Sequence, residues 1–286
     1  MTGSNTIVYQ EAWTTKLQEQ LDEPNKFKEI CRVEYTNDRV LHNPYHTDPT
    51  VQDHTRGCAY TFQKVTLTDD SVTINTSKIL PMMIDRADRA QQTFMRQMEM
   101  AERQGVLLNE AIETAVYADH ANFTDFDNSA IGGGAGNITV SSSNIDDIIR
   151  GLKREIREAN GEGLLERNGG FVVWRPADLE ILEGFMQANG YVMADRALAK
   201  GTVQGINYMG MEHYSSNLLT SGHVFAGVKN LYHVGILKDT YGQIVVVDEP
   251  ADSSGSYSAI GVISRVDYKG KVWNNISGLL FDVTVE

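Results

Sequence analysis

The chain opens with two short stretches in which apolar residues recur at helical spacing. Pro24 separates the stretches, and a helix is expected to end near or before a proline. Residues 1–34 are too few to bury two apolar faces in a core of their own. We therefore predict an N-terminal arm that lies against another surface. The apolar positions of the arm are Trp13, Leu17, Leu21, Phe27, Ile30 and Val33.

Residues 35–80 predict a polar excursion that ends in a hairpin. Residues 39–57 are rich in His, Asn, Asp, Pro and Thr. The patterns of residues 59–67 and 71–75 alternate and contain β-branched and aromatic residues, which predicts two strands around a turn. An isolated hairpin is marginally stable in water, so we expect this one to dock on a neighbouring chain. The candidate contacts of arm and hairpin are Trp13, Leu17, Leu21, Phe27, Tyr60 and Phe62.

The next pattern predicts one very long helix over about residues 83–119. Apolar residues follow a helical stripe, and charged residues such as Glu110 and Glu113 occupy the opposite face. Such a helix is roughly 55 Å long at 1.5 Å per residue. Gly105 interrupts it, and glycine costs roughly 1 kcal/mol relative to alanine inside a helix. We predict that Gly105 is a hinge.

Beyond the helix, a polar and glycine-rich linker over residues 120–142 precedes a compact α/β unit. Ser143 and Asp146 indicate a helix start, and residues 171–174 read as a buried strand. Pro176 is typical of the first turn of a further helix. Later strands are expected at residues 206–211, 223–228, 242–247, 259–268 and 278–285. The whole order predicts an α+β fold.

Composition narrows the classes of function. The chain carries 25 basic and 38 acidic residues, a formal charge of -13, which disfavours a dedicated nucleic-acid binder. Cys31 and Cys58 are far apart, so we expect reduced thiols in a cytoplasmic protein. No apolar run is long enough for a membrane span, and the start lacks the pattern of a signal peptide.

Three features could suggest a phosphate loop, a metal site or a hydrolase, but in each case the sequence favours a reading without such chemistry. The glycines of residues 132–136 lack the strand, helix and Lys-Ser/Thr of a phosphate loop, which favours a linker. His42, His46 and His54 lie near two aspartates, but their spacing matches no regular metal motif, and we favour a solvated loop. The sequence lacks the G-x-S-x-G elbow that would indicate a hydrolase. We therefore predict no enzyme activity, no catalytic or metal residues and no cofactor.

Three local motifs, taken in the order of elements, resemble the major capsid proteins of tailed bacteriophages, which have the Hong Kong 97-like coat fold. Residues 171–179 (FVVWRPADL) resemble the strand-to-helix entry of the axial domain. Residues 210–219 (GMEHYSSNLL) resemble a stretch common in these coats, and residues 267–272 (DYKGKV) resemble their late strand and turn. The resemblance spans essentially the whole chain and rests on order rather than on a catalytic signature.

The resemblance implies five parts. They are an N-arm (1–34), an E-loop (35–80), a peripheral domain with the spine helix (81–130), an axial domain (131–250) and late strands returning to these domains (251–286). It also implies that copies of the chain assemble as hexamers and pentamers into an icosahedral shell. The shell would enclose double-stranded DNA in the virion, without sequence-specific binding, after assembly in the host cytoplasm.

Further expectations follow from the same resemblance. The arm pattern starts almost at Met1, so we expect a separate scaffolding protein, together with a portal and a possible decoration protein. Some relatives cross-link an E-loop lysine to an asparagine. Lys64, Lys78, Asn274 and Asn275 are placed suggestively, but no local motif fixes them, and we predict no cross-linking. The alternatives are an encapsulin-type compartment shell and, further off, a soluble α/β enzyme.

Overall fold

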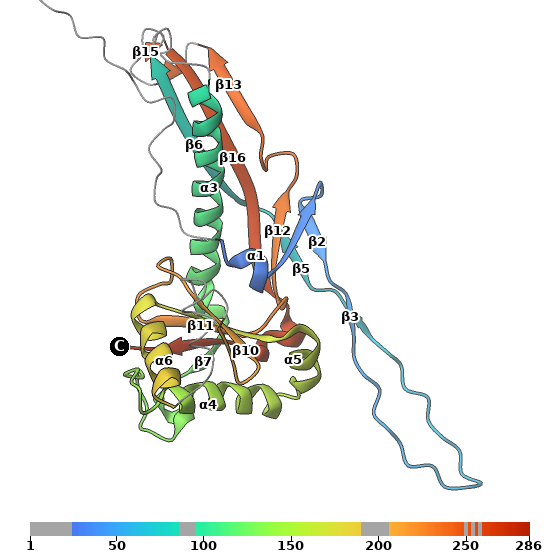
Figure 1. The fold of residues 1–286 in the computed structure, drawn as a ribbon. Helices are drawn as coiled ribbons and strands as arrows, with labels where there is room; N and C mark the ends of the chain where they lie inside the picture. The colour runs from blue at the N-terminus through green and yellow to red at the C-terminus, as the bar shows by residue number, and fades with distance from the viewer. Residues whose placement is uncertain (1–24, 86–94, 190–205, 249–250, 253–254, 257–258) are drawn as a thin grey trace, which may run out of the picture.

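The computed structural model describes residues 25–85, 95–189, 206–248, 251–252, 255–256 and 259–286. Figure 1 shows an elongated body in which a long helix runs beside a tall sheet, above a second sheet that is surrounded by shorter helices. A hairpin projects sideways from the body. The mixture of helices and mainly antiparallel strands confirms the predicted α+β class.

The tall sheet is built around one long strand, β16. On one edge of β16 lies β6, in an antiparallel register of ten residue pairs, and β12 and β13 pair with it as well. β1 extends the sheet by pairing in parallel with β12. The strands are β1 (Arg32–Thr36), β6 (Thr76–Asp85), β12 (Tyr232–Leu237), β13 (Ile244–Asp248) and β16 (Ala259–Val272).

The long helix α3 (Met95–Ala118) lies against this sheet (Figure 1). Gln104 is fully buried between them, where its amide donates to Val262 O at 3.3 Å and accepts from the Ser264 hydroxyl. The prediction of a helix from residue 83 is wrong at its start, because residues 83–85 continue β6. Short apolar runs suit a strand or a helix alike, and pairing with β16 decides for the strand.

The lower sheet has the strand order β7-β17-β11-β8-β10-β9. β8 is buried along its whole length, with β11 antiparallel on one side and β10 parallel on the other. The strands are β7 (Thr124–Phe126), β8 (Gly170–Trp174), β9 (Ile206–Tyr208), β10 (Met211–Ser215), β11 (His223–Val228) and β17 (Leu280–Thr284). The predicted buried strand at 171–174 and the strand at 223–228 are confirmed.

Three helices accompany the lower sheet: α4 (Ile145–Glu158), α5 (Glu162–Asn168) and α6 (Pro176–Ala188). α4 buries the apolar stripe that the sequence predicts, and Pro176 begins α6 as expected. The helix start differs, because Asn144 rather than Ser143 is the capping residue. The sequence missed α5 altogether.

The chain crosses between the two sheets several times. β7, within residues 81–130, joins the lower sheet. β12 and β13, within residues 131–250, pair with β16 of the tall sheet. β12 itself was not predicted. Small pieces complete the chain: α1 (Phe27–Ile30), η1 (Asp119–Asn122), η2 (Asn128–Ile131), η3 (Asn274–Leu279), β14 (Ala251–Asp252) and β15 (Gly255–Ser256).

Among the described residues, none of the helices combines the length and the apolar composition that a membrane span needs.

Candidate assembly surfaces and a histidine–aspartate cluster

The projecting hairpin is formed by two short ladders and a long tip. β2 (Val40–His42) pairs with β5 (Ser71–Thr73), and β3 (Tyr45–His46) pairs with β4 (Leu67–Thr68). The predicted strand at 59–67 is therefore wrong for most of its length, because only Leu67 lies in a ladder. Residues 47–66 form the tip, which reaches away from the body (Figure 1).

Glutamine side chains hold the two sides of the tip together where the strand ladder has ended. The Gln63 amide donates to Thr50 O at 2.8 Å and accepts from Thr50 N–H at 2.7 Å. Gln52 donates to Thr61 O at 3.1 Å. These bonds imitate a strand pairing, so the tip keeps an extended shape without a core beneath it.

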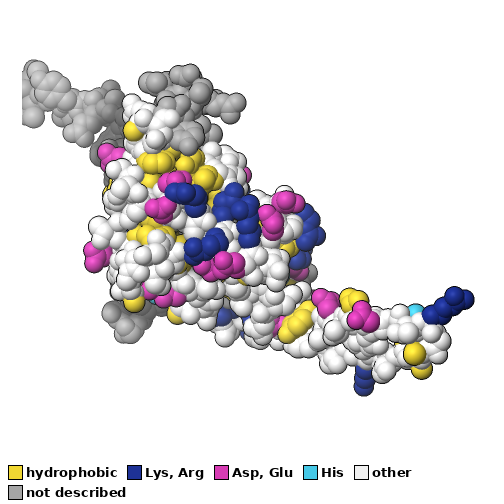
Figure 2. All heavy atoms as spheres, turned by 90° about the horizontal axis from the view of Figure 1, so that it is seen from below, with side chains coloured by type: hydrophobic (Ala, Val, Ile, Leu, Met, Phe, Trp, Pro, Cys, Tyr) yellow, Lys and Arg dark blue, Asp and Glu magenta, His cyan; other side chains and the backbone are white. Residues whose placement is uncertain are grey.

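The tip exposes large apolar side chains that its own chain does not cover. Phe62 is 85% exposed and Tyr60 66% exposed, and their rings meet edge to face with centroids 5.2 Å apart. Figure 2 shows the hairpin projecting from the body with hydrophobic side chains on its surface. Burying one aromatic side chain contributes roughly 1.5–3 kcal/mol, so the tip has the composition of a contact surface.

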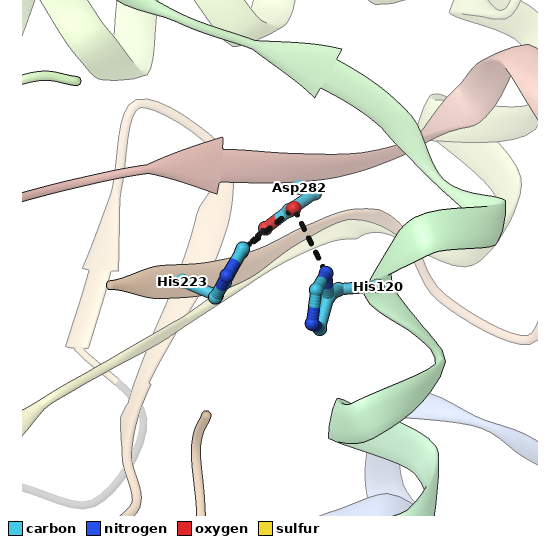
Figure 3. Close-up of side chains that lie close together, drawn as sticks. All are labelled: His120, His223 and Asp282. Carbon is cyan, nitrogen blue, oxygen red and sulfur yellow. Dashed lines mark hydrogen bonds and ion pairs between the residues drawn. The ribbon is translucent and has the colours of Figure 1, made fainter. Parts of the chain in front are cut away.

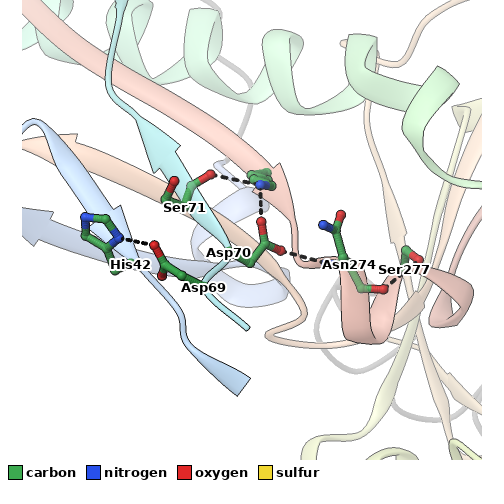
Figure 4. A network of polar contacts seen from close by, with 7 residues as sticks. His42, Asp69, Asp70, Ser71, Asn274 and Ser277 are labelled. Carbon is green, nitrogen blue, oxygen red and sulfur yellow. Dashed lines mark hydrogen bonds and ion pairs between the residues drawn. The ribbon is translucent and has the colours of Figure 1, made fainter. Parts of the chain in front are cut away.

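The base of the hairpin is fixed to the body through Asp70. Its carboxylate accepts from the backbone N–H of Asn274 at 2.9 Å and from the Lys271 ammonium (Figure 4). Burial alone would raise the pKa of Asp70, but these hydrogen bonds hold the pKa below its usual value. The neighbouring Asp69 faces His42 instead, in an exposed pair at 2.8 Å (Figure 4).

A second apolar surface lies on the tall sheet. Strand register places Ile79, Met83 and Val245 on one face, opposite to the face on which Gln104 meets Ser264. All three side chains are more than half exposed, at 58%, 55% and 53%. Solvated apolar rows beside an edge strand such as β13 are typical of protein contacts.

Of the four contact candidates in the predicted arm, the structure describes only Phe27. Phe27 is fully buried among residues of its own chain, as is Ile30, and β1 joins the tall sheet. The prediction that Phe27 contacts a neighbouring chain is therefore wrong, since the end of the predicted arm is part of the core. The other three candidates, Trp13, Leu17 and Leu21, lie outside the described residues.

The segment around Phe27 is attached to the body through Glu113, which the sequence pattern placed on the solvated face of the long helix. Glu113 is fully buried and accepts from Lys26 N–H at 2.8 Å and from the Tyr117 hydroxyl at 2.7 Å. Burial and this carboxylate raise the pKa of Tyr117, and burial raises the pKa of the Cys31 thiol.

The predicted hinge residue and the candidate cross-linking residues lie in separate parts of the fold. Gly105 lies inside α3, which continues through it as regular helix. Lys64 is on the exposed tip and Lys78 on β6. Asn274 and Asn275 are exposed in η3.

The hairpin histidines do not converge with other potential metal ligands in the described part of the chain. Among the described residues, a single group of His, Cys, Asp and Glu side chains converges closely enough to hold an ion, and it does not include His42, His46 or His54. The glycines at 132–136 follow the 3-10 helix η2 and precede an isolated bridge at Ile138. They thus lack the strand and helix of a phosphate loop.

The group that does converge is His120, His223 and Asp282, which the sequence analysis missed. They come from η1, β11 and β17, and Figure 3 shows both imidazoles turned toward one carboxylate. His223 Nδ1 lies 2.8 Å from Asp282 Oδ2, and His120 Nδ1 lies 3.4 Å from the same oxygen. The imidazole rings stack with centroids 3.7 Å apart. Burial raises the pKa of Asp282, and the two histidines oppose that shift.

Comparison with known proteins finds no matching family model and no matching curated protein. Solved structures do match, over nearly the whole chain. A structure from Mycobacterium phage Che8 is 17% identical, covers 98% of each chain and has a TM-score of 0.66. The capsid of Ralstonia phage GP4 is 12% identical, covers 99% of each chain and has a TM-score of 0.64. The capsid of cyanophage P-SCSP1u is 11% identical, covers 97% of this chain and 93% of that one, and has a TM-score of 0.65.

The chain has the fold of these phage capsid structures. At such low identity the likeness concerns the fold and carries no residue-level roles. It agrees with the fold class that the order of elements predicts. The convergence of His120, His223 and Asp282 is a property of this chain's own side chains.

Proposed function

We propose that this chain is the major coat protein of a tailed bacteriophage or related particle, with a structural rather than a catalytic role. The observation that carries the proposal is a capsid-type fold over nearly the whole chain, combined with a hairpin that exposes aromatic side chains far from its own core. A surface of that kind is stabilised only when another molecule covers it. In a shell, the covering molecule is a second copy of the chain.

The parts correspond to those of a Hong Kong 97-like coat. The hairpin would be the E-loop, α3 the spine helix of the peripheral domain, and the lower sheet with α4 to α6 the axial domain. Support comes from the position of each part in Figure 1: α3 and β16 run together, and the hairpin leaves the body near the junction of the two sheets. The N-arm is then confined to residues before Phe27, because Phe27 and Ile30 are core residues.

Assembly would proceed through several surfaces of moderate strength. The E-loop tip with Tyr60 and Phe62 would lie on one neighbour, and the face with Ile79, Met83 and Val245 would meet another. Specific interfaces typically bury ~1,600 Å² in total. Repeated contacts within hexamers and pentamers then stabilise a closed shell through multivalency.

The further partners of the proposal are a scaffolding protein, a portal and packaged double-stranded DNA, with a decoration protein on some shells. The formal charge of -13 suits a wall that does not adhere to DNA. On the face that Figure 2 shows, basic and acidic side chains are interspersed. Such a surface favours enclosure of DNA over sequence-specific binding.

The test is electron microscopy of the purified full chain, alone and with a candidate scaffolding protein. We expect closed shells from the natural sequence. Phe62→Ser should lower shell yield at least tenfold while leaving the subunit folded, since the side chain is 85% exposed. Thr61→Ser is the matched control on the same tip and should assemble normally.

A chain that stays monomeric under every assembly condition would overturn the proposal. Normal shells from Phe62→Ser would contradict the proposed E-loop contact but not the proposed role as a coat protein. The contents of particles made in cells separate the two kinds of shell: nuclease-protected DNA supports a phage coat, and an enzyme cargo supports a compartment.

A further inference from the structure

We propose that His120, His223 and Asp282 form a binding site for a divalent transition-metal ion of the Zn²⁺ class. One ligand atom from each residue lies within 4.8 Å of the others. Two imidazoles and one carboxylate are an established donor set for zinc, with a water as the fourth ligand. The proposal concerns the isolated subunit and stands or falls independently of shell assembly.

The distances between the potential ligand atoms suit a single bound ion after small side-chain movements. Ligand atoms about 2.0 Å from a tetrahedral zinc lie roughly 3.3 Å from one another. The two measured distances from Asp282 Oδ2 are 2.8 Å to His223 Nδ1 and 3.4 Å to His120 Nδ1, on either side of that value. The Nδ1 atoms of both rings are directed at the carboxylate, as Figure 3 shows. An ion seated between them would replace the His223–Asp282 hydrogen bond and the His120–Asp282 ion pair with three coordinate bonds.

The charge around the site also favours a cation. Asp125 of β7 is the register partner of Asp282 in β17, so the two carboxylates lie side by side on one face of the sheet. Within the described part of the chain, Asp282 forms ion pairs with the two histidines and with no lysine or arginine. A divalent ion would relieve this excess of negative charge.

The three ligand side chains have fixed positions in the fold but remain partly accessible to solvent. The side chain of Asp282 is 10% exposed, whereas those of His120 and His223 are 28% and 26% exposed. The carboxylate is thus sheltered from bulk water, and the imidazoles form the entrance through which an ion with its water would arrive. Two ligands stand on paired strands, β11 and β17, which fixes their spacing.

The site connects parts of the fold that are distant in sequence. His120 lies in η1, directly after the long helix α3, while His223 and Asp282 belong to the adjacent strands β11 and β17 of the lower sheet. A bound ion would therefore tie the end of α3 to that sheet. Because the ion binds the folded chain and not the unfolded one, it would raise the temperature of unfolding.

The competing explanation is a metal-free cluster in which one carboxylate accepts from two imidazoles. The chain offers a matched control for it, because His42 and Asp69 form a His–Asp pair with the same 2.8 Å separation but no second imidazole. Zn²⁺ and Co²⁺ are the probes. The chelator-treated full chain is titrated with each below the concentration at which it assembles, with visible absorption reporting on Co²⁺ and calorimetry on Zn²⁺.

We expect one ion per chain, and an unfolding temperature several degrees higher with Zn²⁺ than with chelator. His120→Ala and Asp282→Asn should each weaken binding at least tenfold, and His42→Ala should leave it unchanged. Absence of binding to the natural chain would overturn the proposal, as would undiminished binding in His120→Ala. His120 is decisive because it lies in a partly exposed 3-10 turn, so its loss is compatible with folding even where Asp282→Asn is not.

Discussion

The Asp70 carboxylate accepts a hydrogen bond from the backbone N–H of Asn274 at 2.9 Å, across 204 residues of sequence. The contact joins the base of the projecting hairpin to the turn that follows the longest strand of the tall sheet (Figure 4). The Lys271 ammonium binds the same carboxylate and also donates to Ser71 O at 2.8 Å. The direction in which the hairpin leaves the body is thus set by one buried charge and its donors.

Asp70→Ala should lower the free energy of unfolding by about 2–3 kcal/mol, because the Asn274 N–H loses its acceptor and the partly buried Lys271 ammonium loses its charged partner, keeping only Ser71 O. Denaturant unfolding measures this loss. Asp69→Ala removes the adjacent exposed pair with His42 and should cost less than about 1 kcal/mol. Equal losses in the two variants would contradict the anchoring role of Asp70.

The same carboxylate should contribute to acid sensitivity. The folded-state pKa of Asp70 lies below the ordinary value of 3.8. Its contribution to stability is therefore present above that value and is lost as the pH falls through the folded-state pKa. Asp70→Ala should flatten the pH dependence of unfolding in this acidic window alone.

A second prediction concerns the buried carboxylate of α3. Glu113→Ala should lower the free energy of unfolding by about 3 kcal/mol, because Lys26 N–H and the Tyr117 hydroxyl would both lose a buried acceptor. Glu113→Gln keeps one acceptor oxygen and should cost roughly half as much. Thr114→Ala, at the next and exposed position, should change stability by less than about 0.5 kcal/mol. Comparable effects at 113 and 114 would show that the carboxylate is not part of the core.

A third prediction concerns pH. His213 is fully buried and accepts from Trp174 Nε1–H at 2.9 Å, and burial lowers its pKa to about 4. The unfolded chain binds a proton below the ordinary value of 6.5 that the folded chain does not. Stability should therefore be complete above pH 6.5 and fall by about 3 kcal/mol as the pH drops to about 4.

His213→Gln retains an acceptor for Trp174 but cannot titrate. Its unfolding free energy should vary less between pH 6.5 and 4 than that of the natural chain, whatever its absolute stability. His54→Gln, on the exposed hairpin tip, is the surface control for the substitution itself and should change stability at pH 7 by less than about 0.5 kcal/mol. If the unfolding free energy of His213→Gln varies with pH as steeply as that of the natural chain, His213 is not the source of this pH dependence.

Sequence patterns predicted the elements whose burial is one-sided or complete. The stripe of α4 and the unbroken apolar run of β8 leave few alternatives, since period and composition agree. The order of elements also indicated the fold that the phage capsid structures share. By contrast, residues 79–85 suit a strand or a helix, and only the long partner β16 selects the strand.

The features that sequence missed depend on contacts between distant segments. Glu113 reads as solvated on a helical wheel, yet it is fully buried and accepts from Lys26 N–H, 87 residues away in the sequence. His223 and Asp282 are 59 residues apart, and neither has a neighbour in sequence that suggests a ligand. Such convergence has no local signal, because strand register and helix ends create it.

The last prediction concerns Gly105 as the hinge of α3. Its φ is not in the left-handed region, and a Cβ added there meets no atom within 4 Å. Gly105→Ala should therefore stabilise the subunit by about 0.5–1 kcal/mol, chiefly through the lower entropy of the unfolded chain. Gly151→Ala in α4 is the opposing control, because its Cβ would lie 2.8 Å from the Phe126 ring and should destabilise. If α3 bends at Gly105 as a precursor shell expands, Gly105→Ala should slow expansion several-fold in time-resolved scattering while raising the unfolding temperature. A stabilised variant that expands at the natural rate would show that the helix does not bend at this residue.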